Sequence, residues 1–442
     1  MIPLSNLAPF LPPDLAKTYN RVKQHIDAKT GIIPWLKEIP TNYAGDLFHI
    51  YQAKHPIIAQ NDKLFRLLRN LESTSSAIGS SREEAMMLAI CEALERWSCV
   101  TQGNEISFSY SYNQLRDRAI HPALLHGYST IQYDNRVQNN IEHPTGGGYI
   151  PESLDLDLQV NWCPVYDLVN QEWKYILKSS CYYGCSDGNR VFSVADSRGV
   201  AAGPNKAFCI WNGLLELVET DAGAIWNANR IKCPAIDIES FNNPFFESIK
   251  DLHERLDRDL WAIDISMDVA GVVVIAVISR DRLTDSVIKG FGSHPIPERA
   301  LQKALMECCQ MLPNVIEDEI SQKDGAEPTY RPRPNRREEL CLTHFKPNDN
   351  LPIRQLADYP NSPSIKTSRH LVSALTRVGV TPMIHDATRP ELGLHVLRIL
   401  APGMRSWFNR RAGGRIHEVP IKLGLRTTPL AEHELNDKPV EA

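Results

Sequence analysis

Two pairs of glutamates, Glu92/Glu95 and Glu216/Glu219, form the pattern in this sequence that is best suited to chemistry. Residues three apart on a helix project from the same face, so each pair presents two carboxylates side by side. Two like charges about 4 Å apart repel by roughly 4 kcal/mol at an effective dielectric near 20. If the two pairs meet, the cluster is stable only when it is protonated or holds cations. Mg²⁺ that bridges carboxylates and phosphate oxygens is the usual solution.

The second pair has surroundings that strengthen this interpretation. The stretch "GLLELVETDAGAIW" (213–226) sets Glu216, Glu219 and Asp221 among large apolar residues, and no Lys or Arg occurs from 207 to 229. A buried carboxylate without a partner is costly or takes up a proton. Positive charge should therefore reach these acids from another part of the chain or from a bound ion.

Exposed helix faces are the competing interpretation. The Glu-x-x-Glu spacing is common, and Glu92 is placed to pair with Arg96 at i,i+4. For the first pair taken alone, this alternative is favoured. The apolar neighbours of the second pair favour a shared site that holds cations.

The two pairs belong to segments with one plan, in which a glycine-containing loop of small residues leads into a helix that carries Glu-x-x-Glu. The first helix is expected over 81–98, where Ser81 and Glu84 fit a capping box, and the second over 205–224. A third should begin at Pro297. Apolar runs predict strands within 160–169, 191–203, 260–268, 269–280 and 395–403, and one more helix within 368–380.

We expect four parts in chain order. They are a segment of helices and short linkers (1–70), a core (71–323), a linker or mobile loop (324–338) and a C-terminal αβ part (339–442). The linker prediction rests on "DGAEPTYRPRPNRRE", which combines Pro, Gly and charge without periodicity.

Composition excludes several classes of protein. The 442 residues are 43% hydrophobic and 23% charged, which is typical of a globular protein. A net charge of -5 argues against binding nucleic acid through a basic face. The longest apolar runs are about half of a membrane span, and the N-terminus lacks the features of a signal peptide. We therefore expect a cytoplasmic protein that binds neither nucleic acid nor membranes.

Among the ten cysteines, Cys181 and Cys185 are the only close pair that could suggest a metal site. No second C-x-x-C stands nearby, which favours buried structural thiols over a zinc site. Cys308 and Cys309 lie within a helical pattern and are predicted to be core residues.

A series of motifs resembles the YcaO family, specifically the ATP-dependent azoline cyclodehydratases (the D-type component) that modify ribosomal peptides. The similarity extends over most of the chain. In chain order, the motifs are "AKTGIIPWLKEIP", "EALERWS", "CYYG", "ADSRGVAAG", "GLLELVETDA", "IWNANR", "GFGSHPIPERALQKALMECCQML", "GGRIHEVPIKLG" and "PLAEHELN". Their order and spacing carry the resemblance.

The resemblance implies an α/β YcaO fold, with mixed sheets and helices whose paired Glu-x-x-Glu motifs surround a nucleotide site within 71–323. It implies that Mg²⁺ ions held by Glu92, Glu95, Glu216 and Glu219 grip the phosphates of ATP. Six residues are expected near the nucleotide: Gly79, Ser197, Gly199, Gly203 and Gln310, which match family positions, and Arg198, which replaces the asparagine of the family's Ser-Asn-Gly. Other matched positions are Asn229, Arg230, Glu307 and His294, for which a structural histidine is an equal alternative, while Trp226 is predicted to be a core residue.

Several positions depart from the family pattern. Ile78 replaces a lysine, Pro204 an asparagine, Phe208 a glutamate and Thr220 an arginine, and the chain has "NDKPVEA" in place of a proline-rich end. Arg198 restores one positive charge. Phe208 cannot bind a metal.

By resemblance, the expected function is ATP-dependent conversion of Cys, Ser or Thr in a ribosomal precursor peptide into thiazoline or oxazoline, by phosphorylation of the backbone amide oxygen. The expected partners are the precursor peptide and a separate ThiF-like protein that binds its leader, and a homodimer is expected. The alternatives are a degenerate YcaO protein that acts as a scaffold or substrate-binding subunit, and a YcaO enzyme that makes another backbone modification, a thioamide or an amidine.

Overall fold

Two capped helices with the predicted plan, α3 (Arg82–Ser98) and α9 (Lys206–Asn229), position the glutamate pairs. This computed structural model describes residues 13–56, 74–143, 148–316, 343–438 and 440. The Ser81 hydroxyl accepts the N–H of Glu84, as the capping box requires, but the Glu84 carboxylate accepts from Ser80 instead of Ser81. At the second helix, the Asn205 side chain accepts the N–H of Phe208.

The end of α9 lies five residues beyond the predicted one. The helix continues to Asn229 and ends where Arg230 adopts a left-handed conformation with φ of 49°. The Arg230 guanidinium donates to the backbone carbonyl of Glu434, 2.9 Å away. A contact with a segment 204 residues away therefore helps to determine where this helix stops.

The N-terminal sheet is antiparallel, in the order β1–β2–β3, and packs against α3. The segment 1–70, for which helices and short linkers are predicted, contains helix α1 (Pro13–Val22) and also strands at 36–39 and 49–54. These strands are short, and their burial comes from a helix later in the chain, which a local pattern does not reveal. Their bounds are β1 (Leu36–Ile39), β2 (His49–Lys54) and β3 (Thr74–Gly79).

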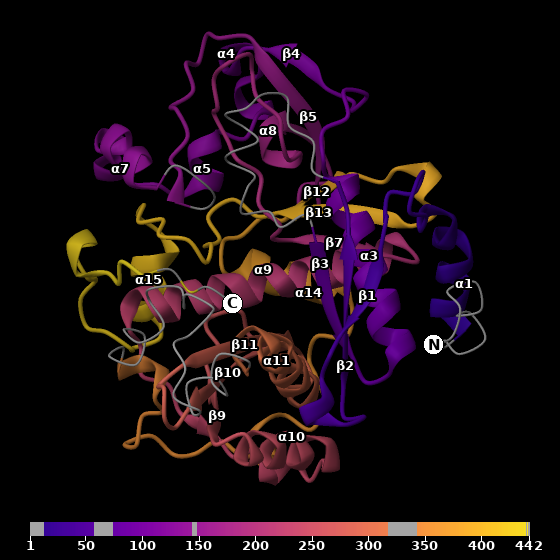
Figure 1. Cartoon of the computed structure of the whole chain (residues 1–442). Helices are drawn as coiled ribbons and strands as arrows, with labels where there is room; N and C mark the ends of the chain where they lie inside the picture. Colours follow the sequence, from indigo (N-terminus) through magenta and orange to yellow (C-terminus); the bar gives the residue numbers. More distant parts are fainter. Residues whose placement is uncertain (1–12, 57–73, 144–147, 317–342, 439, 441–442) are drawn as a thin grey trace.

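A four-stranded antiparallel sheet, in the order β11–β10–β9–β8, lies below α9 in Figure 1. Alternate residues of β10 pack toward α9 and toward α11, because both faces of the sheet are covered. This double coverage explains why β10 is apolar and buried almost throughout. The elements are β8 (Ala235–Ile236), α10 (Pro244–Arg255), β9 (Arg258–Asp264), β10 (Val273–Asp281), β11 (Val287–His294) and α11 (Pro297–Met311).

A six-stranded sheet lies above α9 in Figure 1, in the order β4–β5–β12–β13–β7 with β6 beside β5. Ile399 and Leu397 pack toward α9, whereas Val396 and Val200 pack toward α3, so the two acidic helices cover opposite faces of the β13–β7 edge. The strands are β4 (Phe108–Tyr110), β5 (Val160–Asp167), β6 (Trp173–Leu177), β7 (Val200–Gly203), β12 (Met383–Asp386) and β13 (His395–Leu400).

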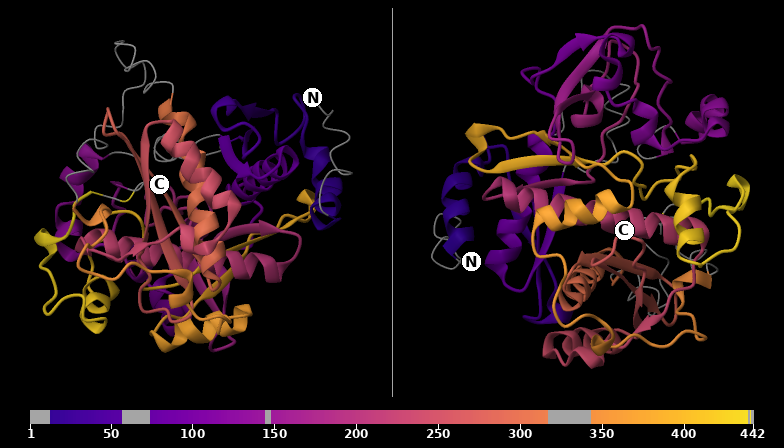
Figure 2. Two further views of the ribbon diagram at one scale, coloured as in Figure 1. Left: turned by 90° about the horizontal axis from the view of Figure 1, so that it is seen from below. Right: turned by 180° about the vertical axis from the view of Figure 1, so that it is seen from behind.

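The remaining helices surround this framework. Figure 2 shows α14 alongside α9 when the molecule is viewed from behind. These helices are α4 (Tyr112–Leu115), α5 (Pro122–His126), α6 (Thr130–Asp134), α7 (Arg136–Glu142), α8 (Lys178–Cys181), α14 (Ser368–Arg377) and α15 (Arg415–Lys422). The predicted linker, 324–338, lies outside the described residues. Within the described ranges, no helix combines the length and apolar character needed to cross a bilayer.

Candidate functional site

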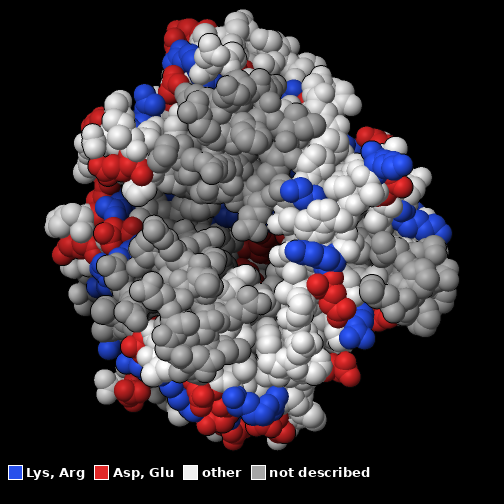
Figure 3. All heavy atoms as spheres, in the orientation of Figure 1, with Lys and Arg blue, Asp and Glu red and all other residues white. Residues whose placement is uncertain are grey.

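The two glutamate pairs meet at β7. The backbone N–H of Ala202 in β7 donates to a carboxylate oxygen of Glu95 at 3.2 Å. Glu216 of α9 is influenced by the same carboxylate: after burial, the charge of Glu95 is the largest cause that raises the pKa of Glu216. Figure 3 shows acidic side chains in a hollow near the centre of the molecular face seen in Figure 1. Both helices pack against β7, and Glu95 and Glu216 are close enough for the charge of one to influence the other.

Burial and mutual repulsion raise the pKa values of these acids. Burial raises the pKa of Glu95 to about 7, with a further contribution from Glu92. The pKa of Glu216 rises well above its usual range because of burial and the charge of Glu95. Burial likewise raises the pKa of Glu219, whose charge, together with burial, raises that of Glu307 in α11 to about 8. We call these five residues the acidic cluster.

Two cations of the described chain, Arg96 and Lys303, lie near the acidic cluster. Arg96 lies 3.3 Å from Glu92 and 4.0 Å from Glu95, and the charge of Lys303 influences Glu219. Among the described residues, no ion pair or hydrogen bond reaches the Glu216 carboxylate. A group of carboxylate oxygens of this kind fits Mg²⁺, which is bound by carboxylates and commonly shared with phosphate oxygens.

Asp221 has a different role from Glu216 and Glu219. Its buried carboxylate accepts from Arg415 in α15 at 2.5 Å and from the backbone N–H of Arg405 at 2.7 Å. The same guanidinium lies 2.7 Å from Asp268. A base that is 194 residues away therefore neutralises the third acid of α9, and Asp221 belongs to a structural ion-pair network.

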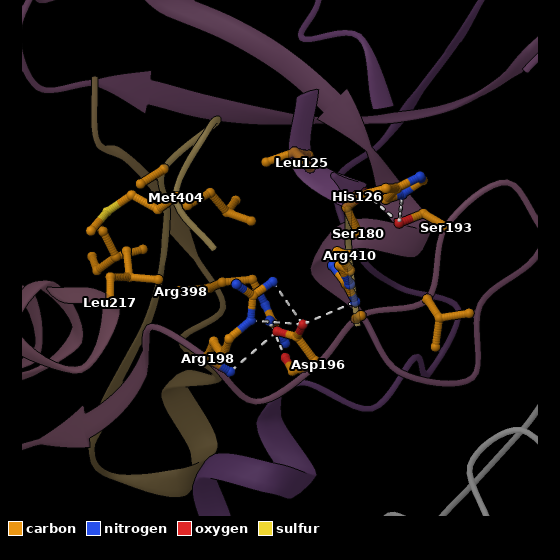
Figure 4. Close-up of a pocket in the computed structure, with 15 residues that line it drawn as sticks. Leu125, His126, Ser180, Ser193, Asp196, Arg198, Leu217, Arg398, Met404 and Arg410 are labelled. Atoms are coloured by element: carbon orange, nitrogen blue, oxygen red, sulfur yellow. Dashed lines mark hydrogen bonds and ion pairs between the residues drawn. The ribbon is translucent and has the colours of Figure 1, made fainter. Parts of the chain in front are cut away.

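A pocket rich in arginine adjoins the acidic cluster. Asp196 lies 2.8 Å from Arg198 and 3.6 Å from Arg410, and its backbone carbonyl accepts from Arg398. Figure 4 shows the three guanidinium groups around Asp196, whose charge also contributes to the raised pKa of Glu216. Positive charge is thus concentrated next to the carboxylates, where it suits an anion such as a phosphate group. The sequence prediction included only Arg198 of these four residues.

Close packing explains why glycine occupies three of the positions that are predicted to lie near a nucleotide. A Cβ at Gly79 would lie 2.5 Å from the backbone nitrogen of Ala85, so the glycine allows β3 to approach the start of α3. A Cβ at Gly199, where φ is 68°, would lie 2.3 Å from the Ile399 carbonyl oxygen. Gly203 has the Phe208 ring against it.

The other predicted nucleotide residues lie close to the same elements. The Ser197 carbonyl accepts from the N–H of Val200 at the start of β7. The Gln310 amide donates to the Ser76 carbonyl at 2.7 Å and connects α11 to β3. Contact of these residues and the glycines with a nucleotide stays a prediction.

The matched positions with undecided roles fall into two groups. Glu307 joins the acidic cluster and accepts the N–H of Phe291 at 2.5 Å. Asn229 and Arg230 contact the C-terminal segment through the carbonyls of Ile416 and Glu434. His294 accepts the N–H of Ile296 at 2.9 Å, and burial lowers its pKa to about 4, so it is a neutral histidine with a structural partner. Trp226 is fully buried in the core.

Comparison with known proteins agrees with this arrangement. Residues 76–405 match the family model described as "YcaO cyclodehydratase, ATP-ad Mg2+-binding". The chain belongs to the YcaO family. The matched segment contains both Glu-x-x-Glu helices, β7 and the arginine-rich pocket up to Arg398. The fold prediction is confirmed, and ATP and Mg²⁺ are the cofactors of this YcaO chain.

Solved heterocyclases have the same fold. A structure described as a heterocyclase in complex with substrate and cofactor is 30% identical, with a TM-score of 0.85 over 97% of this chain and 57% of that one. The heterocyclase TruD is 31% identical, with a TM-score of 0.71 over 81% of this chain and 51% of that one. YcaO from Methanopyrus kandleri, bound with AMPPCP and Mg²⁺, is 19% identical, with a TM-score of 0.59 over 85% of this chain and 86% of that one. This YcaO chain spans about half the length of the two heterocyclases.

The departures from the YcaO pattern differ in their surroundings. Ile78 packs against the core cluster that contains α11. Thr220 is fully buried, and its hydroxyl donates to the Glu216 carbonyl at 2.8 Å, so an arginine there would require the core to move. Phe208 is 46% exposed. Of these three positions, Phe208 is the most exposed.

Replacing Phe208 with Glu should strengthen binding of Mg²⁺-ATP. Phe208 lies two helical turns before Glu216, and the thiol of the adjacent Cys209 is influenced by the Glu95 charge. We expect a gain of about tenfold, equivalent to roughly 1.4 kcal/mol, in calorimetric titrations with Mg²⁺-ATP. Phe208→Gln is the matched control, because it adds an oxygen without charge. Equal affinities for the two variants would contradict a contribution of position 208 to the metal site.

The raised pKa values predict how stability depends on pH. In the folded protein, Glu95 and Glu307 release their protons near pH 7 and 8, whereas their ordinary value is 4.5. Between pH 4.5 and about pH 8, the folded state therefore binds more protons than the unfolded state. The free energy of unfolding consequently falls as pH rises through this range. We expect the Tm of the metal-free protein to decrease from pH 5 to pH 8.5, and Mg²⁺-ATP to weaken that decrease. The Glu95→Gln/Glu307→Gln variant should show a flatter profile in EDTA; a profile parallel to that of the wild type would contradict this origin.

Proposed function

We propose that this chain is an ATP-dependent cyclodehydratase component that converts Cys, Ser or Thr of a ribosomal precursor peptide into thiazoline or oxazoline. The observation that carries the proposal is the acidic cluster, which α3, α9 and α11 assemble beside an arginine-rich pocket. Membership of the YcaO family and the likeness to two heterocyclases at 30% and 31% identity support the reaction class.

The residues of the site have separable tasks in this proposal. Glu92, Glu95, Glu216 and Glu219 would hold Mg²⁺, with Glu307 at the edge of the set. When bound, Mg²⁺-ATP supplies the phosphoryl group that turns a backbone amide oxygen into a leaving group. The chain itself positions the charges: β7 keeps Glu95 in place through the N–H of Ala202, and Arg198, Arg398 and Arg410 concentrate positive charge beside the carboxylates. Such catalysis consists mainly of positioning and charge neutralisation.

In this proposal, a second protein captures the precursor peptide. We propose that a separate ThiF-like protein binds the leader of the precursor and that the chain acts as a homodimer. Both partners are those that the resemblance to the azoline cyclodehydratases implies.

The decisive experiment combines the purified chain with Mg²⁺-ATP and with any Cys/Ser/Thr-rich peptide and any ThiF-like protein that the genes beside its own encode. The expected result is loss of one water per modified residue by mass spectrometry, together with phosphate release, only in the complete mixture. Modification by the chain without the partner would contradict the partner proposal. Exchange of oxygen for sulfur or nitrogen in the product would identify a thioamide or amidine synthase.

A non-catalytic scaffold is the second candidate. Phe208 at the start of α9, a position where the family has glutamate, favours it, because the ring brings no ligand to the metal site. The scaffold predicts that the chain binds the peptide and partner but that the complete mixture releases no phosphate.

A further inference from the structure

A group of buried metal-binding side chains lies in the six-stranded sheet, apart from the acidic cluster. Cys163 of β5, Cys181 at the end of α8 and His385 of β12 place one ligand atom each within 4.8 Å of one another. Cys163 and Cys181 are completely buried, and His385 is 4% exposed. Zn–S bonds are about 2.3 Å long, so two sulfur ligands of one ion are at most about 4.6 Å apart. The group is therefore close to the size of a metal site before any ion enters.

The sheet topology brings the three residues together from distant parts of the sequence. β5 lies between β6 and β12, with Cys163 opposite Ile176 and with Tyr166 opposite Ile384. α8 begins directly after β6 and returns Cys181 over the sheet. The sequence pattern pairs Cys181 with Cys185, whereas the fold pairs it with Cys163, to which Cys181 is hydrogen-bonded.

The two ring nitrogens of His385 have different surroundings. Its Nδ1 lies 3.1 Å from the Pro164 carbonyl oxygen, which only accepts hydrogen bonds, so Nδ1 carries the proton. Nε2 therefore has a lone pair, and among the described residues this buried atom has no hydrogen-bond partner. Burial also lowers the pKa of His385 to about 4, which keeps the ring neutral. A backbone carbonyl that holds the second ring nitrogen is the usual support of a metal-bound histidine.

A buried cation partly offsets the burial that raises the pKa of the Cys181 thiol. Arg398 of β13 is 1% exposed, and its charge acts on Cys181 and on Cys99. Two of its nitrogens, Nε and Nη2, have no hydrogen-bond partner among the described residues. If the two cysteines bound a metal ion as thiolates, they would place negative charge near this guanidinium. Neutral thiols provide no such charge.

We propose that Cys163, Cys181 and His385 bind a soft d¹⁰ metal ion, Zn²⁺ or Cu⁺, which joins β5, α8 and β12. Two thiolates and one imidazole are the donors that such ions prefer, and they are a poor match for Mg²⁺. Arg398 balances the single negative charge left by Cu⁺ with two thiolates, whereas Zn²⁺ leaves a neutral site.

Metal titration of the purified chain tests the proposal. Co²⁺ reports on Zn²⁺ sites, because only thiolate ligands produce sulfur-to-cobalt charge-transfer absorption, which separates this site from the carboxylates of the acidic cluster. Cu⁺ is titrated without oxygen against a chromogenic chelator. We expect one ion per chain and a rise in Tm on binding. The affinity should fall roughly 100-fold in Cys163→Ser and in Cys181→Ser and stay unchanged in Cys185→Ser, the matched control thiol.

A measurement on the unaltered chain makes the test independent of folding of the variants. Differential alkylation and mass spectrometry should show that the metal protects Cys163 and Cys181 but leaves the reactivity of Cys185 and Cys233 as it was. Absence of charge-transfer absorption together with absence of Cu⁺ binding would overturn the proposal. So would protection of other cysteines, or oxidation of Cys163 and Cys181 to a disulfide that metal does not prevent.

Discussion

Glu216→Gln should abolish ATP consumption and leave the metal-free protein as stable as the wild type or more stable. Burial and the Glu95 charge raise the pKa of Glu216, so its carboxylate is unfavourable in the folded state until a cation binds. The amide removes this unfavourable charge and also removes a metal ligand. A loss of phosphate release on the order of 100-fold or more is expected, as for other preorganised electrostatic groups.

Melting curves with and without Mg²⁺-ATP provide the second readout for this variant. The wild type should gain stability from Mg²⁺-ATP, whereas Glu216→Gln should gain much less. Glu247→Gln in α10 is the matched control, because Glu247 is exposed on the far side of the four-stranded sheet. A large loss of stability in metal-free Glu216→Gln would instead indicate that the glutamate has a structural partner.

The sequence predicted those helices that begin at a recognisable capping residue or proline. The start of α3 follows from Ser81 and that of α11 from Pro297, and the amphipathic patterns supply their lengths. β1 and β2 were not predicted, because each has few residues and becomes buried only by packing against α3. The same reason explains the longer α9, whose last turn is stabilised by the C-terminal segment around Glu434.

Only those parts of the candidate site that depend on residue spacing within one helix could be predicted from the sequence. The i,i+3 pairs indicated two carboxylates on each helix, and the lack of nearby bases around Glu216 indicated that a cation must come from elsewhere. The partners across the fold were not predictable. Arg398 and Arg410 reach Asp196 across about two hundred residues, and only the lone arginine in the apolar run "HVLRIL" was a signal of a buried cation. His385 and Cys163 meet Cys181 through the pairing of strands that the sequence does not specify.

Arg415→Met should destabilise the protein by about 3–5 kcal/mol, the usual cost of breaking a buried ion pair. Arg415 is the partner of two carboxylates that are almost completely buried, Asp221 at 2.5 Å and Asp268 at 2.7 Å. Methionine fills most of the space, so the loss comes from leaving two charges without their cation in a region that water does not reach. The midpoint of urea unfolding and the Tm should both decrease.

Lys422→Met is the matched control for this change. Lys422 lies 3.4 Å from Asp268 but is 57% exposed, so water already screens the pair. Its loss should change the free energy of unfolding by less than about 1 kcal/mol. Adding Asp221→Asn and Asp268→Asn to Arg415→Met should recover part of the lost stability, since the charges that lack a partner are then removed. If Arg415→Met instead unfolds at the same urea concentration as Lys422→Met, this ion-pair network does not hold the C-terminal helix α15 to α9. The hydrogen bond from the backbone N–H of Arg405 would then be the interaction that stabilises the buried Asp221 carboxylate.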